Sequence, residues 1–572
     1  MTELCLARKQ LLSTEGHLLV LGGPGSGKTT IALLKANHEV ETGRLKRGQQ
    51  ILFLSFARAT LSRIAEQSVG RLTAENRKSL ELNTYHGFTW NVLRSHAYLL
   101  RKDRKVRVFP PAEAAAHLAD VPANTRSQEL QRLFEEEGLL HFDLFAGCCA
   151  SLFEKSEALR EVFCDAYPII IVDEFQDTNS DEWALIRLLG QKSTIIALGD
   201  PEQRIYEFRG ADPRRIGEFS TSFSPATFDF GIENHRSATT DIVSFANDLL
   251  RGQLQKSYQN VKTFRYGFYN GKSELYFAKT ALLQSLKRVS KRCETGGSVA
   301  LLVPSNRLML QLSDYLSKNV DSLPPINHNV ALDAEGPALA ASMIAVLLEA
   351  AVNSVEEQKK LLRSLINHIR GRSGSKRPSQ ANIVLSKALS SYLAGEKIRG
   401  SKRLGVISEI ESLVSQRASM VLSGDPGKDW LIIRQLLNNC GSEVLKQVAE
   451  DAKYLRLLRK GAVLQSRLSD IWRATGGYEG AVAAVNDAIL QDHFVGASHE
   501  TKGVYIMTIH KAKGKDFDEV VVFEGRHTRI VRARSTSAEI AQARLSLRVA
   551  VTRARMNAVI VTPQNDPCPL LI

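Results

Sequence analysis

A glycine-rich loop near the N-terminus carries the clearest chemistry in this chain. Residues 22–29 read Gly-Gly-Pro-Gly-Ser-Gly-Lys-Thr and lie between an apolar run at 18–21 and a helix-compatible run at 31–34. Such a loop points backbone N–H groups at phosphate oxygens, while Lys28 reaches the outer phosphates and Thr29 holds Mg²⁺. The pattern predicts a nucleoside triphosphate site, the alternative being a chance match in a turn. The residues predicted to bind the triphosphate are Gly22, Gly25, Gly27, Lys28, Thr29 and Thr30.

Two adjacent acidic residues follow a second apolar segment. Asp173 and Glu174 come directly after residues 167–172, a β-branched run typical of a strand buried in a parallel sheet. Ligands bind at the carboxyl ends of such strands. We therefore predict that Asp173 holds Mg²⁺ through water and that Glu174 is the general base that orients the attacking water. An isolated Asp-Glu pair would more often be a helix cap or a surface feature.

The composition limits the class of protein and of partner. The chain has 572 residues, room for three or four domains, and 75 Lys and Arg against 61 Asp and Glu give a net charge of +14. This charge favours a polyanion such as nucleic acid, although general solubility explains it equally well. The seven cysteines show no CxxC spacing, which argues against a disulfide framework or a zinc site. With no membrane-spanning stretch and no room for a cleavable signal, a soluble cytoplasmic protein without membrane contact is expected.

Apolar runs that read as strands alternate with helical segments in part of the chain only. Further strands are predicted at 51–56 and 194–200, whereas residues 87–164 and 346–495 have helical periodicity. The second helical region contains two stretches rich in Gly, Ser and basic residues, which suit contact with duplex phosphates and suit disordered linkers equally well. These stretches are residues 370–377 and 397–403.

Five segments resemble motifs of superfamily 1 helicases of the UvrD/Rep/PcrA type. Residues 172–179 and 199–210 resemble motifs II and III, and the remaining three resemble motifs IV, V and VI at 234–237, 507–517 and 549–554, all in family order. The resemblance implies an α/β fold with two RecA-like P-loop NTPase domains, each with a parallel sheet interrupted by a mainly helical insertion, and ATP between them. The implied domains are 1–86 with 165–231, its insertion 87–164, 232–345 with 496–572, and its insertion 346–495.

The resemblance assigns further residues to catalysis. Arg236 and Arg553 would come from the second domain to stabilise charge on the leaving phosphates, the alternative being surface ion pairs. Gln203 would sense the γ-phosphate and link the nucleotide state to DNA contacts, the alternative being an ordinary turn residue. ATP and Mg²⁺ are the implied cofactors.

Departures from the family leave the preference for the base open, although ATP is favoured over GTP. His235 stands where the family usually has the tyrosine that stacks on adenine. The position of the adenine-reading glutamine aligns by spacing with Ala7, and the nearest glutamine is Gln10. Asp516 stands where the family has the glutamate that contacts the ribose.

Aromatic and polar residues at family positions along the single-strand groove are predicted to contact DNA. Aromatic rings can stack on any base, which suits a motor that must grip every sequence. For each ring the alternative is a place in the core, and for the histidine of motif V it is a structural role. The predicted contacts are Phe56, Arg58, Tyr85, His86, Tyr206, Phe208 and His510.

The implied activity is an ATP-driven motor that moves 3′ to 5′ on single-stranded DNA and separates tailed duplex. The chain ends soon after residues 549–554, so no appended nuclease domain is expected. Its layout resembles the helicase component of two-gene anti-phage systems such as Gabija, with a nuclease subunit as partner, and a stand-alone repair helicase is the rival. Two other classes are a DNA-end-stimulated ATPase subunit that does not unwind and a nucleotide switch without a nucleic acid partner. The oligomeric state is not indicated.

Overall fold

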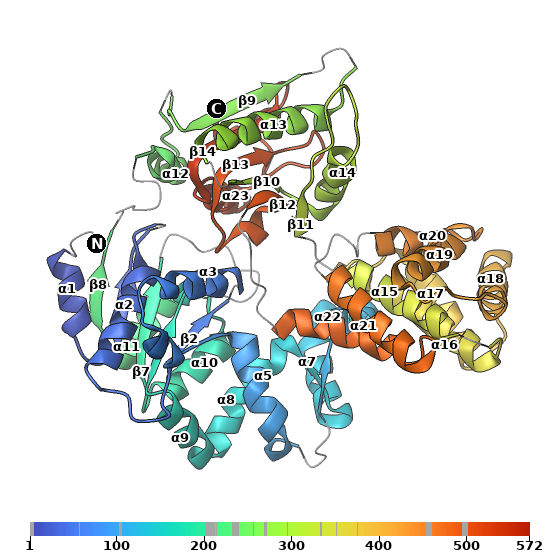
Figure 1. Ribbon diagram of the computed structural model, residues 1–572, viewed down its shortest axis with the longest axis horizontal. Helices are drawn as coiled ribbons and strands as arrows, with labels where there is room; N and C mark the ends of the chain where they lie inside the picture. Colours follow the sequence, from blue (N-terminus) through green and yellow to red (C-terminus); the bar gives the residue numbers. More distant parts are fainter. Residues whose placement is uncertain are drawn as a thin grey trace. The chain divides into compact units, whose positions relative to one another are not determined.

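The computed structural model of the chain is shown in Figure 1. It describes residues 5–23, 25–56, 58–101, 106–200, 212, 214–231, 239–255, 257–267, 271–293, 296–331, 335–350, 352–374, 376–453, 460–494 and 502–571. The chain divides into two compact units, which are described separately. Unit 1 is Met1–His96, Ala146–Ala331 and Gly496–Ile572, and unit 2 is Ala97–Phe145 and Leu332–Val495.

The first sheet of unit 1 has six parallel strands in the order β3-β2-β6-β7-β1-β8. Strands β2 and β6 are buried along their whole length, as expected for apolar runs covered on both faces. The core of this sheet includes side chains from α1, α2 and α3. The strands are β1 (Leu18–Leu21), β2 (Ile51–Ser55), β3 (Leu80–Thr84), β6 (Ile169–Val172), β7 (Thr194–Gly199) and β8 (Ala226–Asp229).

The strand order brings the glycine loop and the acidic pair to one edge of this sheet. Strands β6, β7 and β1 are neighbours, with Val172 beside Ala197 and Leu21 beside Gly199. Because the strands are parallel, the glycine loop after β1 and the acidic residue Asp173 after β6 leave the sheet at the same edge. This edge is therefore where the predicted nucleotide site lies.

The second sheet of unit 1 also has six parallel strands, in the order β11-β12-β10-β13-β14-β9. Figure 1 draws this sheet partly in green and partly in red, because its strands come from two distant parts of the sequence. Two parallel sheets in one chain confirm the predicted α/β fold with two RecA-like cores. The strands are β9 (Val261–Tyr266), β10 (Ser298–Val303), β11 (Asn329–Ala331), β12 (Gly503–Thr508), β13 (Phe517–Phe523) and β14 (Ala554–Pro563).

Helices complete unit 1. No described helix of the chain is long and apolar enough to cross a bilayer. The helices are α1 (Leu6–Ser13), α2 (Lys28–Glu41), α3 (Arg58–Val69), α4 (Ala74–Lys78), α5 (Tyr85–His96), α8 (Phe145–Lys155), α9 (Glu157–Ala166), α10 (Ser180–Leu189), α11 (Arg215–Phe223), α12 (Ile242–Arg251), α13 (Glu274–Arg292), α14 (Asn306–Leu316) and α23 (Ser537–Val551).

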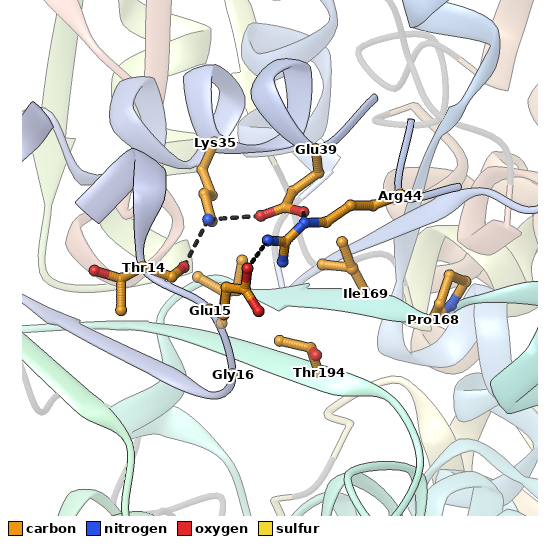
Figure 2. A pocket seen from close by; sticks show the side chains of 10 residues that line it. Thr14, Glu15, Gly16, Lys35, Glu39, Arg44, Pro168, Ile169 and Thr194 are labelled. Carbon is orange, nitrogen blue, oxygen red and sulfur yellow. Dashed lines mark hydrogen bonds and ion pairs between the residues drawn. The ribbon is translucent and has the colours of Figure 1, made fainter. Parts of the chain in front are cut away.

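A buried ion pair anchors the helix that follows the glycine loop. The ammonium of Lys35 on α2 donates to the carbonyl of Thr14 at 2.7 Å and pairs with Glu39 at 2.6 Å. Arg44 pairs with both Glu39 and Glu15. Figure 2 shows these side chains around a cavity of about 170 Å³ at the amino ends of β6 and β7. The network therefore fixes the second half of α2 against the turn between α1 and β1.

Unit 2 is mainly helical, with one short parallel strand pair. Helix α15 is apolar and buried on nearly every side, as expected for a helix at the centre of a bundle. It packs against α16, α20 and α22. The elements are α6 (Pro111–His117), α7 (Arg126–Arg132), α15 (Glu335–Glu349), α16 (Val355–Gly371), α17 (Gln380–Leu393), α18 (Ser401–Ala418), α19 (Pro426–Asn438), α20 (Glu443–Lys453), α21 (Lys460–Thr475), α22 (Ala481–Phe494), β4 (Arg107–Phe109) and β5 (Leu139–His141).

The predicted insertion 87–164 is divided between the two units, since most of α5, α8 and α9 belongs to unit 1. Helix α15 belongs to unit 2, although its first residues were expected in the second RecA-like domain. The four-domain boundaries stay a prediction.

The two basic stretches of unit 2 differ from each other. In the first, Arg370 lies in the last turn of α16 and pairs with Asp120 at 3.1 Å, while Arg372 pairs with Asp451 at 3.0 Å. These two arginines are therefore held by ion pairs within the unit. The second stretch leads into α18 and exposes most of its basic side chains, so its contact with duplex DNA stays a prediction.

Candidate nucleotide site

The glycine loop is held to the sheet by its own backbone. The N–H of Gly22 donates to the carbonyl of Gly199 at 3.2 Å, and the N–H of Gly23 donates to the carbonyl of Gly231 at 2.9 Å. Gly27 caps α2 with a φ of +88°, a left-handed conformation that glycine adopts without a steric penalty. The loop thus turns sharply into a helix N-terminus, the geometry expected for an anion site.

The ammonium of Lys28 lies inside this loop. It donates to the carbonyl of Gly22 at 2.6 Å and to the carbonyl of Gly23 at 3.1 Å. Phosphate oxygens are charged acceptors and form stronger hydrogen bonds than backbone carbonyls do. Lys28 is therefore placed where it can exchange the loop carbonyls for phosphate oxygens.

The two acidic residues at the end of β6 are held differently from each other. Asp173 is buried, and its N–H donates to the carbonyl of Leu54 at 2.9 Å. Glu174 has a φ of +53°, which is uncommon for a residue with a side chain. Gln176 donates to its carboxylate at 2.6 Å. Backbone strain at this position is consistent with a functional residue whose side chain must point in one direction.

The charges around these carboxylates shift their pKa values in opposite directions. Burial and the neighbouring charge of Glu174 raise the pKa of Asp173 above its usual range. Burial also works to raise the pKa of Glu174, but the cations Lys513 and Lys28 outweigh it and lower this pKa. Glu174 therefore stays ionised near neutral pH, as a general base requires.

Residues of the second sheet reach this site within unit 1. Lys513, which lies between β12 and β13, forms an ion pair with Asp177 and lies 3.7 Å from the carboxylate of Glu174. Arg548 on α23 lies 3.9 Å from Asp200, which follows β7. The first sheet thus contributes the acidic groups of this cluster, and the elements around the second sheet contribute the basic groups.

Asp516 and Arg553 directly precede β13 and β14, which are neighbouring strands of the second sheet. The N–H of Phe517 donates to the carbonyl of Arg553 at 2.9 Å, and the guanidinium of Arg553 lies 3.9 Å from Asp516. Arg63 on α3 donates to Asp516 at 2.8 Å. In this conformation Asp516 is a buried partner of two arginines, and its predicted contact with a ribose stays a prediction.

The donor set at the end of β6 fits Mg²⁺. Asp173 supplies a buried carboxylate and Thr29 a hydroxyl at the start of α2, and Mg²⁺ commonly takes few protein ligands and keeps several waters. The described residues contain no group of three or more His, Cys, Asp or Glu side chains that could hold a metal alone. Binding of Mg²⁺ by Thr29 and Asp173 stays a prediction.

The predicted DNA-contacting residues differ in exposure. Phe56 is half-buried and stacks on Tyr85 with ring centroids 4.7 Å apart, whereas Tyr85 itself is 2% exposed. His86 and His510 are exposed. Of this pair of rings, Phe56 is the one accessible to a base in this conformation, and all these contacts stay predictions.

Several predicted residues lie wholly or partly outside the part of the chain that the structure describes. The described part of α1 includes Gln10, whose side chain is exposed, and Arg58 is the first residue of α3, although its side chain lies outside the described set. The other predicted residues outside the described ranges are Gln203, Tyr206, Phe208, His235 and Arg236.

The structure adds residues that sequence reasoning did not select. Gln176 and Asp177 lie inside the segment that resembles motif II, so their position was a usable signal. Lys513 is different, because it lies in the segment that resembles motif V, and the resemblance already gave it a role, with His510, between nucleotide and DNA. Arg63 and Arg548 gave no such signal, because each is a charged residue in an ordinary helical pattern.

Comparison with known sequences gives two family matches. Residues 6–126 and 102–224 match the UvrD/REP helicase N-terminal domain, and residues 350–565 match the UvrD-like helicase C-terminal domain. Two similar proteins are both named ATP-dependent DNA helicase PcrA. The one from Staphylococcus aureus is 23% identical over 295 residues, 44% of this chain and 40% of the relative. The one from Staphylococcus epidermidis is 23% identical over 357 residues, 54% and 48% respectively. The matches thus span less than half the length of either relative.

Proposed function

Because the chain belongs to the UvrD-like helicases of superfamily 1, we propose that it is an ATP-hydrolysing motor that acts on DNA. The observation that carries the proposal is the charged cluster in which the buried Lys513, between β12 and β13 of the second sheet, meets the partly buried Glu174 and the buried Asp177 that follow β6 of the first. A nucleotide bound at the glycine loop would join this cluster. Hydrolysis would then change contacts on both sheets at once.

The chain's own residues account for the chemical step. Lys28 contacts the outer phosphates, and Glu174, held ionised by nearby cations, orients the attacking water and accepts its proton. Arg553 stabilises charge that develops on the phosphates. Mg²⁺, when bound by Asp173 and Thr29, neutralises charge on the phosphate oxygens.

The DNA contact is supported by the net charge of +14 and by the half-buried ring of Phe56. The direction, 3′ to 5′ on single-stranded DNA, rests on the family resemblance. A nuclease partner in a Gabija-like anti-phage system also rests on this resemblance, and so does the alternative, a role in DNA repair. Co-purification of the chain with a nuclease encoded beside it tests the first of these roles.

Purified protein with tailed duplex DNA tests the activity. We expect single-stranded DNA to stimulate ATP hydrolysis and a 3′ tail, but not a 5′ tail, to support strand separation. Stimulation without separation would instead indicate a DNA-sensing ATPase subunit. Hydrolysis indifferent to DNA would indicate a nucleotide switch and would contradict the proposal. Glu174→Gln is the control for contaminating ATPases.

A further inference from the structure

Helix α1 contacts the phosphate loop through Arg8. The guanidinium of Arg8 donates to the carbonyl of Ser26 at 3.0 Å and lies 4.6 Å from the centre of the Phe230 ring. Ser26 and Phe230 are both buried. A guanidinium held over the face of a buried ring is restrained in position, so its hydrogen bond to the loop is restrained as well.

This bond sets the orientation of one peptide group in the loop. The carbonyl of Ser26 and the N–H of Gly27 belong to the same planar, trans peptide unit and therefore point in opposite directions. Arg8 holds the carbonyl on its own side, so the N–H of Gly27 points away from Arg8. Among the described residues, no hydrogen bond occupies this N–H.

The restraint matters because the loop is rich in glycine. Gly25 and Gly27, on either side of Ser26, both have positive φ and can rotate with little steric resistance. The backbone that follows β8 holds the start of the loop, through the Gly231 carbonyl that accepts from Gly23 at 2.9 Å. Arg8 holds the far end of the loop, beside a ring from the same segment.

We propose that Arg8 is a positioning residue for the triphosphate, which orients the Gly27 N–H toward the phosphates before the nucleotide binds. The proposal deepens the proposed function, since it concerns the same nucleotide site. Arg8 acts on the phosphate loop and not on the base, so its contribution is independent of which base the nucleotide carries. Gln10, on the same helix with an exposed side chain, makes no such contact among the described residues.

Binding of ATP, GTP and inorganic tripolyphosphate to the full chain tests this role by calorimetry. We expect Arg8→Ala to weaken all three ligands by the same factor of about ten, the size expected for loss of a charged hydrogen bond. Arg8→Lys keeps the charge but not the planar, stacked donor, so it should restore only part of the affinity. Gln10→Ala is the matched control and should leave tripolyphosphate binding unchanged.

Three outcomes would overturn the proposal. A loss confined to ATP would mean that Arg8 reads the base, full rescue by Arg8→Lys would mean that only charge matters, and unchanged binding would mean that the contact is incidental. If Arg8→Ala fails to fold, Arg8→Lys with the same three ligands decides. Under the proposal, saturating ATP restores the turnover of the variant to within about twofold of the wild-type kcat, since KM alone carries the effect. Failure of DNA to stimulate the wild-type protein would contradict the motor and leave these binding results unaffected.

Discussion

The chain buries acidic side chains in both units, but their carboxylates receive different numbers of hydrogen bonds. In unit 2, Asp451 accepts hydrogen bonds from His368 at 2.9 Å and from Arg372 at 3.0 and 3.1 Å. Gln447 donates to the same carboxylate at 3.2 Å. Burial works to raise the pKa of Asp451, but the bonds from His368 and Arg372 outweigh it and lower this pKa. Both carboxylate oxygens have donors, as expected for a structural ion pair.

In unit 1, the carboxylates at the end of β6 share fewer donors. Burial raises the pKa of Asp173 and of Asp177, and among the described residues no hydrogen bond reaches Oδ1 of Asp177. Glu174 is held in a strained backbone conformation. Burial of charge is therefore common to both regions. The candidate nucleotide site differs in two respects. A buried carboxylate oxygen of Asp177 has no hydrogen-bond donor among the described residues, and the backbone of Glu174 is strained. A bound ligand could supply the missing contacts.

The strongest test removes the catalytic carboxylate. We expect Glu174→Gln to lower kcat by about 10³, because a general base contributes about 10² to 10⁴. ATP binding should stay within a few fold, since the phosphate loop is unchanged. Lys28→Ala should abolish hydrolysis and weaken ATP binding as well. Turnover near the wild-type rate in either variant would refute the site.

The matched change in unit 2 should affect stability and not catalysis. Asp451→Asn removes the charge that pairs with the half-exposed Arg372 and weakens the bonds from Arg372 and His368, which should lower the unfolding free energy by about 1.5–3 kcal/mol. The rate of ATP hydrolysis per folded molecule should remain that of the wild type. Urea denaturation and steady-state ATPase assays measure the two effects. A catalytic defect without a change in stability would contradict the structural role of Asp451.

Replacement of Lys513, the cation next to Glu174, should change the pH dependence of hydrolysis. Lys513 lowers the pKa of Glu174, so Lys513→Met should raise this pKa and leave the base protonated at higher pH. The acidic limb of the kcat profile should therefore move to higher pH. At a fixed pH on that limb, activity should fall about tenfold for each pH unit that the limb moves. Lys513→Arg, which keeps the charge, is the control, and an unmoved acidic limb would show that Lys513 does not control the base.

The smallest expected effect concerns the stacked ring pair. Phe56→Ala should leave basal hydrolysis intact and weaken DNA stimulation several-fold, because one stacked base contributes about 1–3 kcal/mol. Tyr85→Phe should be nearly neutral, since the buried hydroxyl of Tyr85 has no hydrogen-bond partner among the described residues. Fluorescence titration with single-stranded DNA compares the variants. Equal binding by wild type and Phe56→Ala would place Phe56 in the core.

Local patterns predicted the fold class, and they located the glycine loop and the acidic pair that the first sheet brings to one edge. The glycine loop and the acidic pair each follow an apolar strand, and a strand, loop and helix in sequence fix their own geometry. By contrast, the pair between Arg63 and Asp516 joins residues 453 positions apart, and nothing in either local segment indicates the other. Helical periodicity likewise marks most of α5 as a helix without showing whether a sheet or other helices will cover it.

The N–H of Phe517, the first residue of β13, donates to the carbonyl of Arg553, which directly precedes β14. This bond lies beside the contact between Arg553, the arginine proposed to stabilise charge on the phosphates, and Asp516, which accepts a hydrogen bond from Arg63 on α3. Under the proposed function, a movement of Arg553 toward a bound triphosphate would also displace Asp516 and change its hydrogen bond to Arg63. Nucleotide chemistry and the contact between the two sheets would then change together.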